Sequence, residues 1–141
     1  LSRSPVTVKL SPLSWMDPMI AHGLYVSHTA LELFLGAIKL SGHYAHEKTT
    51  HTPRHKPETS KAYTRHHAIA LLALAYLGYV ALKRDLVDEP IGRDLSTVLC
   101  LFHAGVTLVF LHSCYLGAMP RAKVIVPHLP WAVGFAWHAF R

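Results

Sequence analysis

Histidine is the residue type that offers this chain most of its chemistry, because 12 of its 141 residues are histidines. They form two groups. Six lie in or beside a polar stretch at about residues 41–65, and six lie within or at the ends of apolar segments. Imidazole is the commonest metal ligand in proteins, so both groups are candidates for binding a metal or a metal-containing cofactor. The polar-stretch group is His43, His46, His51, His55, His66 and His67, and the apolar group is His22, His28, His103, His112, His128 and His138.

The polar-stretch group contains short patterns that suggest a metal. "HYAH", "HTPRH" and "HH" resemble the histidine boxes of membrane di-iron desaturases and hydroxylases, in which helical spacing directs several imidazoles at two irons. Here Pro53 stands between His51 and His55, and a proline inside a helix breaks it. The usual second pair of boxes is missing. A solvated loop that binds metal loosely is the simpler interpretation, and a di-iron membrane enzyme or a metal transporter stays an alternative.

The apolar group includes His103 and His112, in the uncharged stretch from Leu95 to Met119. They are nine positions apart, so on one helix they point in opposite directions. An unpaired imidazole in hydrocarbon costs several kcal/mol, so each should have its own partner. We expect at least one to ligate a tetrapyrrole metal, chlorophyll magnesium in the first place, and the other to do the same or to hydrogen-bond to a neighbouring helix.

The remaining apolar histidines extend this expectation to two layers of ligands, one in each membrane leaflet. His112 and His128 each lie about five residues inside a segment end, which places both about 7 Å below one boundary. His103, His22 and His138 belong to the opposite side. His28 lies near the middle and shares a helical face with Glu32 four residues later; such a pair near a bilayer centre indicates a functional site. The simpler explanation for each histidine is a hydrogen bond to a neighbouring helix or a place near a helix end, and for His28 and Glu32 a mutual hydrogen bond in a helix interface.

Four apolar segments must position these side chains, at about residues 18–40, 66–82, 95–118 and 124–140. A bilayer core of about 30 Å needs about 20 helical residues, which the first and third segments supply. The second and fourth are shorter, with polar-aromatic ends suited to the interface. The second and third lack the polar stripe of a surface helix. A soluble all-α bundle is the alternative. Pro53 and Pro57 predict an irregular connection from about Glu47 to Lys61.

Composition agrees with a membrane protein. Apolar residues make up 51% of the chain and charged residues 16%, against about 25% charged in soluble domains. The net charge of +6 is spread through the loops, and without a basic stripe no nucleic-acid partner is expected. Cys100 and Cys114 are about 21 Å apart along one helix, too far for a disulfide. We expect buried free thiols.

One stretch, "LSPLSWMDPMIAHGLY" from Leu10 to Tyr25, resembles a segment of photosystem I reaction-centre subunit XI. That segment reads approximately L-S-P, then a glutamate-bearing turn, then M-A-H-G-Y-F. The resemblance implies a thylakoid membrane protein. The family's chlorophyll-ligating glutamate would fall near Asp17, which Pro18 follows here, and the family has three membrane helices where four are predicted. The shared residues are Leu10, Ser11, Pro12, Ala21, His22, Gly23 and Tyr25.

The sequence therefore predicts an all-α integral membrane protein, with four transmembrane helices in a single domain and no catalytic centre of its own. We expect an accessory subunit of a photosynthetic complex of the photosystem I type in the plastid thylakoid, in contact with lipids and other subunits. Chlorophyll is the expected cofactor, with carotenoid on the apolar faces. A supernumerary subunit of a respiratory complex in the mitochondrial inner membrane, with or without haem b, is the alternative. The expected cofactor ligands are His103, His112, His28, Glu32, His22, His138 and His128.

Overall fold

Every secondary-structure element in the described part of the chain is a helix. The computed structural model describes residues 16–41, 57–117 and 128–141, and in these ranges no residue lies in a strand. The prediction of an all-α protein is confirmed. The helices are α1 (Met16–Leu40), α2 (Pro57–Lys83), α3 (Pro90–Tyr115) and α5 (Leu129–Phe140).

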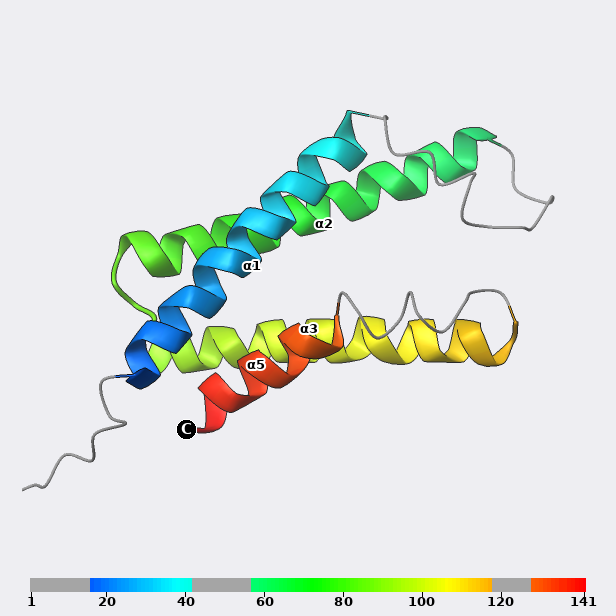
Figure 1. Cartoon of the computed structure of the whole chain (residues 1–141). Helices are drawn as coiled ribbons and strands as arrows, with labels where there is room; N and C mark the ends of the chain where they lie inside the picture. Colours follow the sequence, from blue (N-terminus) through cyan, green and yellow to red (C-terminus); the bar gives the residue numbers. More distant parts are fainter. Residues whose placement is uncertain (1–15, 42–56, 118–127) are drawn as a thin grey trace, which may run out of the picture.

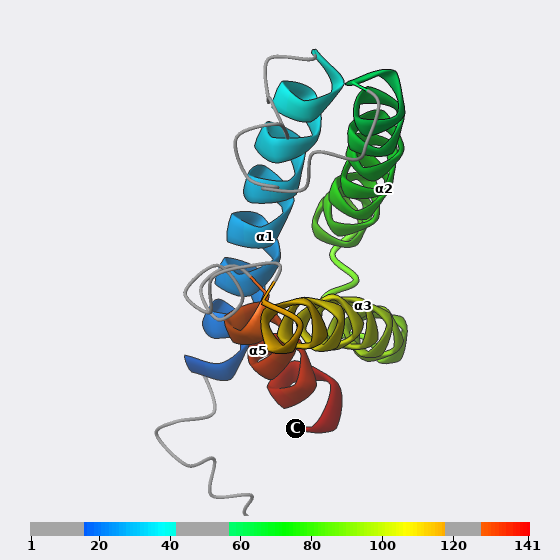
Figure 2. The same ribbon diagram turned by 90° about the vertical axis from the view of Figure 1, so that its right-hand side faces the viewer.

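The helices pack as two antiparallel pairs. α1 lies along α2, and α3 lies along α5, with a smaller contact between α1 and α5 (Figure 1). The pairs are joined by a short turn between α2 and α3, and they diverge with distance from that turn. Figure 2 views α3 nearly along its axis and shows α1 and α2 rising side by side from it. The two pairs therefore meet at the end of the molecule that holds the start of α1, the α2–α3 turn and Arg141.

Prolines and glycines set the ends of the helices. Asp17 and Pro18 lie in the first turn of α1, as expected for a start signal. Pro90 opens α3 directly after the N-cap residue Glu89. Past its end, Gly117 has a φ of +72°, the left-handed conformation that closes many helices. These local signals explain where α1 begins and where α3 begins and ends.

Two boundaries differ from those predicted. α2 begins at Pro57, so the expectation of an irregular chain up to Lys61 is wrong for residues 57–61. Proline is well tolerated in a first helical turn, because the N–H that it lacks has no intrahelical partner there. The rest of that stretch, residues 47–56, lies outside the described residues. α5 begins at Leu129 and has 12 residues, which is about 18 Å and too short to cross a bilayer unaided.

A small apolar core lies where the two pairs meet. It includes Tyr25 of α1, Leu74 of α2, Leu99 of α3 and Phe135 of α5. α1 packs closely against α2 at Gly36, where a Cβ would lie 2.8 Å from a Leu72 side-chain atom and 3.3 Å from the carbonyl oxygen of Ala68. Small residues allow this approach, as they do between membrane helices.

Two helices are long and apolar enough to cross a membrane. They are the spans Ala62–Lys83 and Pro90–Tyr115, and within an apolar stretch of 18 residues in each, only 28% and 22%, respectively, is buried within the chain. Core helices of soluble proteins are mostly buried, so these spans present apolar side chains outward. Val98, Leu101, Leu108 and Val109 of α3 are each more than half exposed. Four transmembrane helices were predicted, and two meet this test among the described residues.

Candidate functional site

Four ionisable side chains meet near the middle of the bundle and form what we call the His–Glu cluster: His28, Glu32, His103 and His128. The Nε2 atoms of His28 and His103 are 2.8 Å apart. The Oε1 atom of Glu32 lies 3.5 Å from His28 Nε2 and 3.9 Å from His103 Nε2. On the other side of the His103 ring, Nδ1 is 3.1 Å from Nδ1 of His128. The cluster thus joins α1, α3 and the residue that precedes α5.

Burial of this cluster leaves polar atoms without partners. His28 and His103 are fully buried and Glu32 is 2% exposed. Within the described part of the chain, His28 Nδ1 and Glu32 Oε2 have no hydrogen-bond partner. A buried carboxylate with an unpaired oxygen is costly unless a proton or a cation neutralises it. The cluster can therefore bind a cation through its inward nitrogen and oxygen atoms.

Aromatic side chains from α5 hold the imidazoles in place. The Phe135 ring is nearly parallel to His103, with centroids 6.2 Å apart, and it meets His28 edge-on at 4.9 Å. Trp131 also meets His28 edge-on, at 5.3 Å. Such contacts restrict ring rotation, so the nitrogens of the cluster are directed at one another by the packing of α5.

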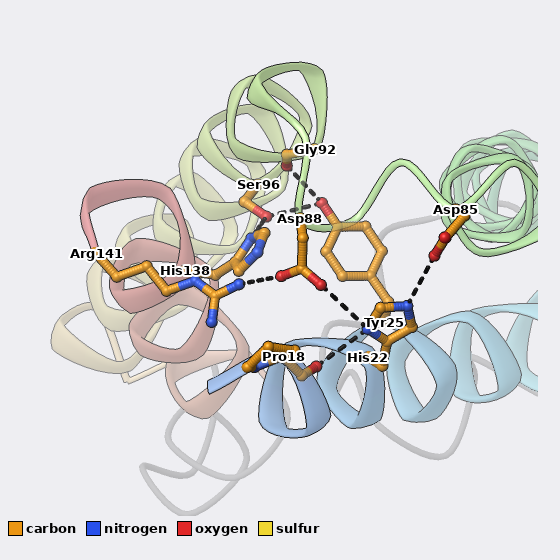
Figure 3. A network of polar contacts seen from close by, with 9 residues as sticks. All are labelled: Pro18, His22, Tyr25, Asp85, Asp88, Gly92, Ser96, His138 and Arg141. Carbon is orange, nitrogen blue, oxygen red and sulfur yellow. Dashed lines mark hydrogen bonds and ion pairs between the residues drawn. The ribbon is translucent and has the colours of Figure 1, made fainter. Parts of the chain in front are cut away.

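A second network lies nearer the α2–α3 turn, and we call it the Tyr25 network (Figure 3). The Tyr25 hydroxyl donates to the carbonyl oxygen of Gly92 at 2.8 Å and is 2.7 Å from Ser96 Oγ. Because the tyrosine has one proton, Ser96 must donate to it. Ser96 Oγ then accepts from His138 Nδ1, 2.6 Å away. These bonds fix the His138 tautomer and tie α1 to α3 and α5.

The outer edge of this network carries ion pairs. Arg141 pairs with Asp88. The ring of His22 lies 3.5 Å from Asp85 and 3.7 Å from Asp88, and its Nδ1 is 3.0 Å from the carbonyl oxygen of Pro18 (Figure 3). These groups are partly or fully exposed. They mark the polar end of the molecule and show that Arg141 returns to the same end as the α2–α3 turn.

The structure brings together part of the predicted ligand set. His28, Glu32, His103 and His128 share the His–Glu cluster, whereas His138 belongs to the Tyr25 network and His22 to its outer edge. His112 is exposed. In the polar-stretch group, His66 contacts the Ala62 carbonyl of its own helix and His67 lies 3.0 Å from Lys39 Nζ. His43, His46, His51 and His55 lie outside the described residues.

The two-layer arrangement of the histidines is wrong for His128. It was expected at the depth of His112, in the leaflet opposite His103, yet it touches His103. That expectation measured depth by counting residues from the predicted helix start at about 124. The expectation failed because α5 begins beside the middle of α3 and not beside its far end, so that His128, directly before Leu129, lies against His103.

Sequence reasoning missed the roles of Tyr25 and Ser96. A signal was available: Tyr25 precedes His28 by three positions and Ser96 precedes His103 by seven, so each lies on the same helical face as a buried histidine. A polar residue repeated at helical spacing on an apolar helix indicates an inward stripe.

The arrangement constrains where a tetrapyrrole could bind. The 2.8 Å separation of the His28 and His103 nitrogens is that of a hydrogen bond, and both ring nitrogens of His103 contact other imidazoles. His112 differs, because it is exposed and is flanked along α3 by Leu108, Leu111 and Tyr115, which are also exposed.

Comparisons of the chain with protein-family models, with curated proteins and with solved structures found no match.

Proposed function

We propose that the chain is a non-catalytic accessory subunit of a larger membrane complex. The observation that carries this proposal is the distribution of side chains: imidazoles, a carboxylate and hydroxyls are buried, while large apolar residues of α2 and α3 face outward. A soluble bundle would reverse this distribution, because exposing so much apolar surface to water is unfavourable. Lipid and partner subunits would cover these faces.

Four crossings are part of this proposal, and the path of the chain supports them. α3 leads away from the α2–α3 turn, and Arg141 is back at that turn, paired with Asp88. His128 contacts His103, which lies near the midpoint of α3. α5 would therefore complete the second half of a fourth crossing, and α1, with 25 residues, is long enough for the first.

The complex that we propose is photosynthetic, of the photosystem I type in the thylakoid. Support comes from the resemblance of Leu10–Tyr25 to subunit XI and from the surroundings of His112. Chlorophyll magnesium needs one axial ligand and an apolar surface for its ring, and His112 offers an exposed imidazole flanked by Leu108 and Leu111. Carotenoid would lie along the apolar faces. A subunit of a mitochondrial inner-membrane complex, with or without haem b, is the alternative.

Membrane extraction and spectroscopy of the native complex test this proposal. The chain should stay in the pellet after alkaline extraction, and protease should reach tags at Arg141 and in the α2–α3 turn from the same side. A purified complex should show chlorophyll absorbance, and His112→Leu should remove about one pigment per copy. His66→Leu, which changes an exposed histidine of α2, is the matched control. Release of the chain by alkali would refute the membrane assignment, and a haem spectrum or a colourless complex would refute the photosynthetic one.

A further inference from the structure

We propose that His28, Glu32 and His103 bind one divalent first-row transition-metal ion, which fastens α1 to α3. This site differs from the pigment site proposed at His112, and it does not depend on the membrane assignment. Its ligands are two imidazole nitrogens and one carboxylate oxygen, the donor set of many zinc and non-haem iron sites.

The positions of the three atoms fit a single ion. They form a triangle with sides of 2.8, 3.5 and 3.9 Å. The point equidistant from the three corners of that triangle lies about 2.0 Å from each, which matches zinc–nitrogen and zinc–oxygen bond lengths of about 2.0–2.2 Å. All three ligand atoms lie within 4.8 Å of one another and all three residues are buried. The ion would replace the His28–His103 hydrogen bond with two shorter contacts.

The unpaired oxygen of Glu32 is a second, independent observation that points to a cation. Glu32 Oε2 is buried and has no hydrogen-bond partner in the described part of the chain, and the Nε2 atoms of the two imidazoles lie 3.5 and 3.9 Å from the other carboxylate oxygen. A metal ion at the shared point neutralises the carboxylate, and Oε2 can complete a bidentate contact. Mg²⁺ and Ca²⁺ fit less well, because they prefer oxygen ligands over imidazole.

His128 is suited to orient a ligand from outside the site. A neutral imidazole that binds a metal through Nε2 carries its proton on Nδ1. In His103 that Nδ1 is 3.1 Å from Nδ1 of His128, which can accept the proton's hydrogen bond. Phe135 stacks on the same ring. His103 is therefore held in the tautomer and orientation that present its Nε2 lone pair to the ion.

Metal titration of the full chain in detergent tests the site. Because the histidines at 43, 46, 51 and 55 could bind metal loosely, the experiment uses a background in which all four are serine. After chelator treatment, Zn²⁺ should bind at one ion per chain and raise the thermal unfolding midpoint, and Co²⁺ should give a visible d–d spectrum. Glu32→Gln and His103→Asn should each lower the affinity at least tenfold. His138→Asn, which changes a buried histidine of the Tyr25 network, should leave it unchanged.

A measurement on the unaltered cluster covers the case in which these variants fail to fold. X-ray absorption of the zinc-loaded chain should show two imidazoles and oxygen ligands at about 2.0–2.2 Å. A coordination shell that contains sulfur or four imidazoles would overturn the proposal. So would the absence of stoichiometric binding, or equal affinity in the parent, Glu32→Gln and His138→Asn chains.

Discussion

Gly92→Ala should destabilise the protein, because the backbone of the α2–α3 turn occupies the place where the new methyl group would go. A Cβ at this position would lie 2.2 Å from the carbonyl oxygen of Leu86 and 2.3 Å from that of Val87. Both neighbours are main-chain atoms, so no side-chain rotation relieves the contact. The turn and the start of α3 would have to separate by about 1 Å to reach ordinary packing distances.

The size of the effect is the balance of three contributions. Overpacking of this kind costs about 1–3 kcal/mol. Movement of residue 92 also weakens the hydrogen bond that Tyr25 donates to its carbonyl oxygen, worth about 1 kcal/mol. Alanine offsets at most about 1 kcal/mol through its higher helix propensity. The net loss should be about 1–3 kcal/mol, or a fall of roughly 4 °C in unfolding midpoint per kcal/mol.

Gly105→Ala is the matched control, because it makes the same substitution in the same helix. A Cβ on Gly105 meets nothing within 4 Å, so this variant should gain up to about 1 kcal/mol from helix propensity. Both unfolding midpoints would be measured by circular dichroism in one detergent. If Gly92→Ala is as stable as Gly105→Ala, the close packing of α3 against the turn is refuted.

Three further variants probe the contacts between helices. Tyr25→Phe should lower the free energy of unfolding by about 1–3 kcal/mol in a denaturant titration, because the Gly92 carbonyl oxygen and the Ser96 hydroxyl of α3 lose a buried partner. An unchanged free energy of unfolding would show that water replaces the tyrosine hydroxyl. Gly36→Leu should separate α1 from α2 by displacing Leu72, seen as a longer distance between spin labels on the two helices, and an unchanged distance would contradict the glycine contact. Arg141→Ala should cost less than about 1 kcal/mol, because its partner Asp88 is 42% exposed, although the Arg141 side chain itself is 15% exposed; a much larger loss would mean that burial of Arg141 shields the pair from solvent.

The sequence by itself determined the class of the protein and much of the position of its helices. Apolar runs of helical length, with prolines and polar residues between them, predicted helices near all four that the structure shows. Residues on one helix obey a fixed geometry of 3.6 residues per turn, so two relations could be read directly. His28 and Glu32 do share a buried face, and His103 is buried where His112 is exposed.

Only the tertiary structure decided which residues of different helices meet. Helical periodicity gives the direction of a side chain but not the depth at which one helix packs against another, and α5 begins beside the middle of α3 rather than beside its far end. For this reason His128 was placed away from His103, although the two rings touch. The contacts of Tyr25 with Ser96, and of Glu32 with His103, were likewise absent from any local pattern. They exist because the two helix pairs converge at the α2–α3 turn and bring distant polar faces together.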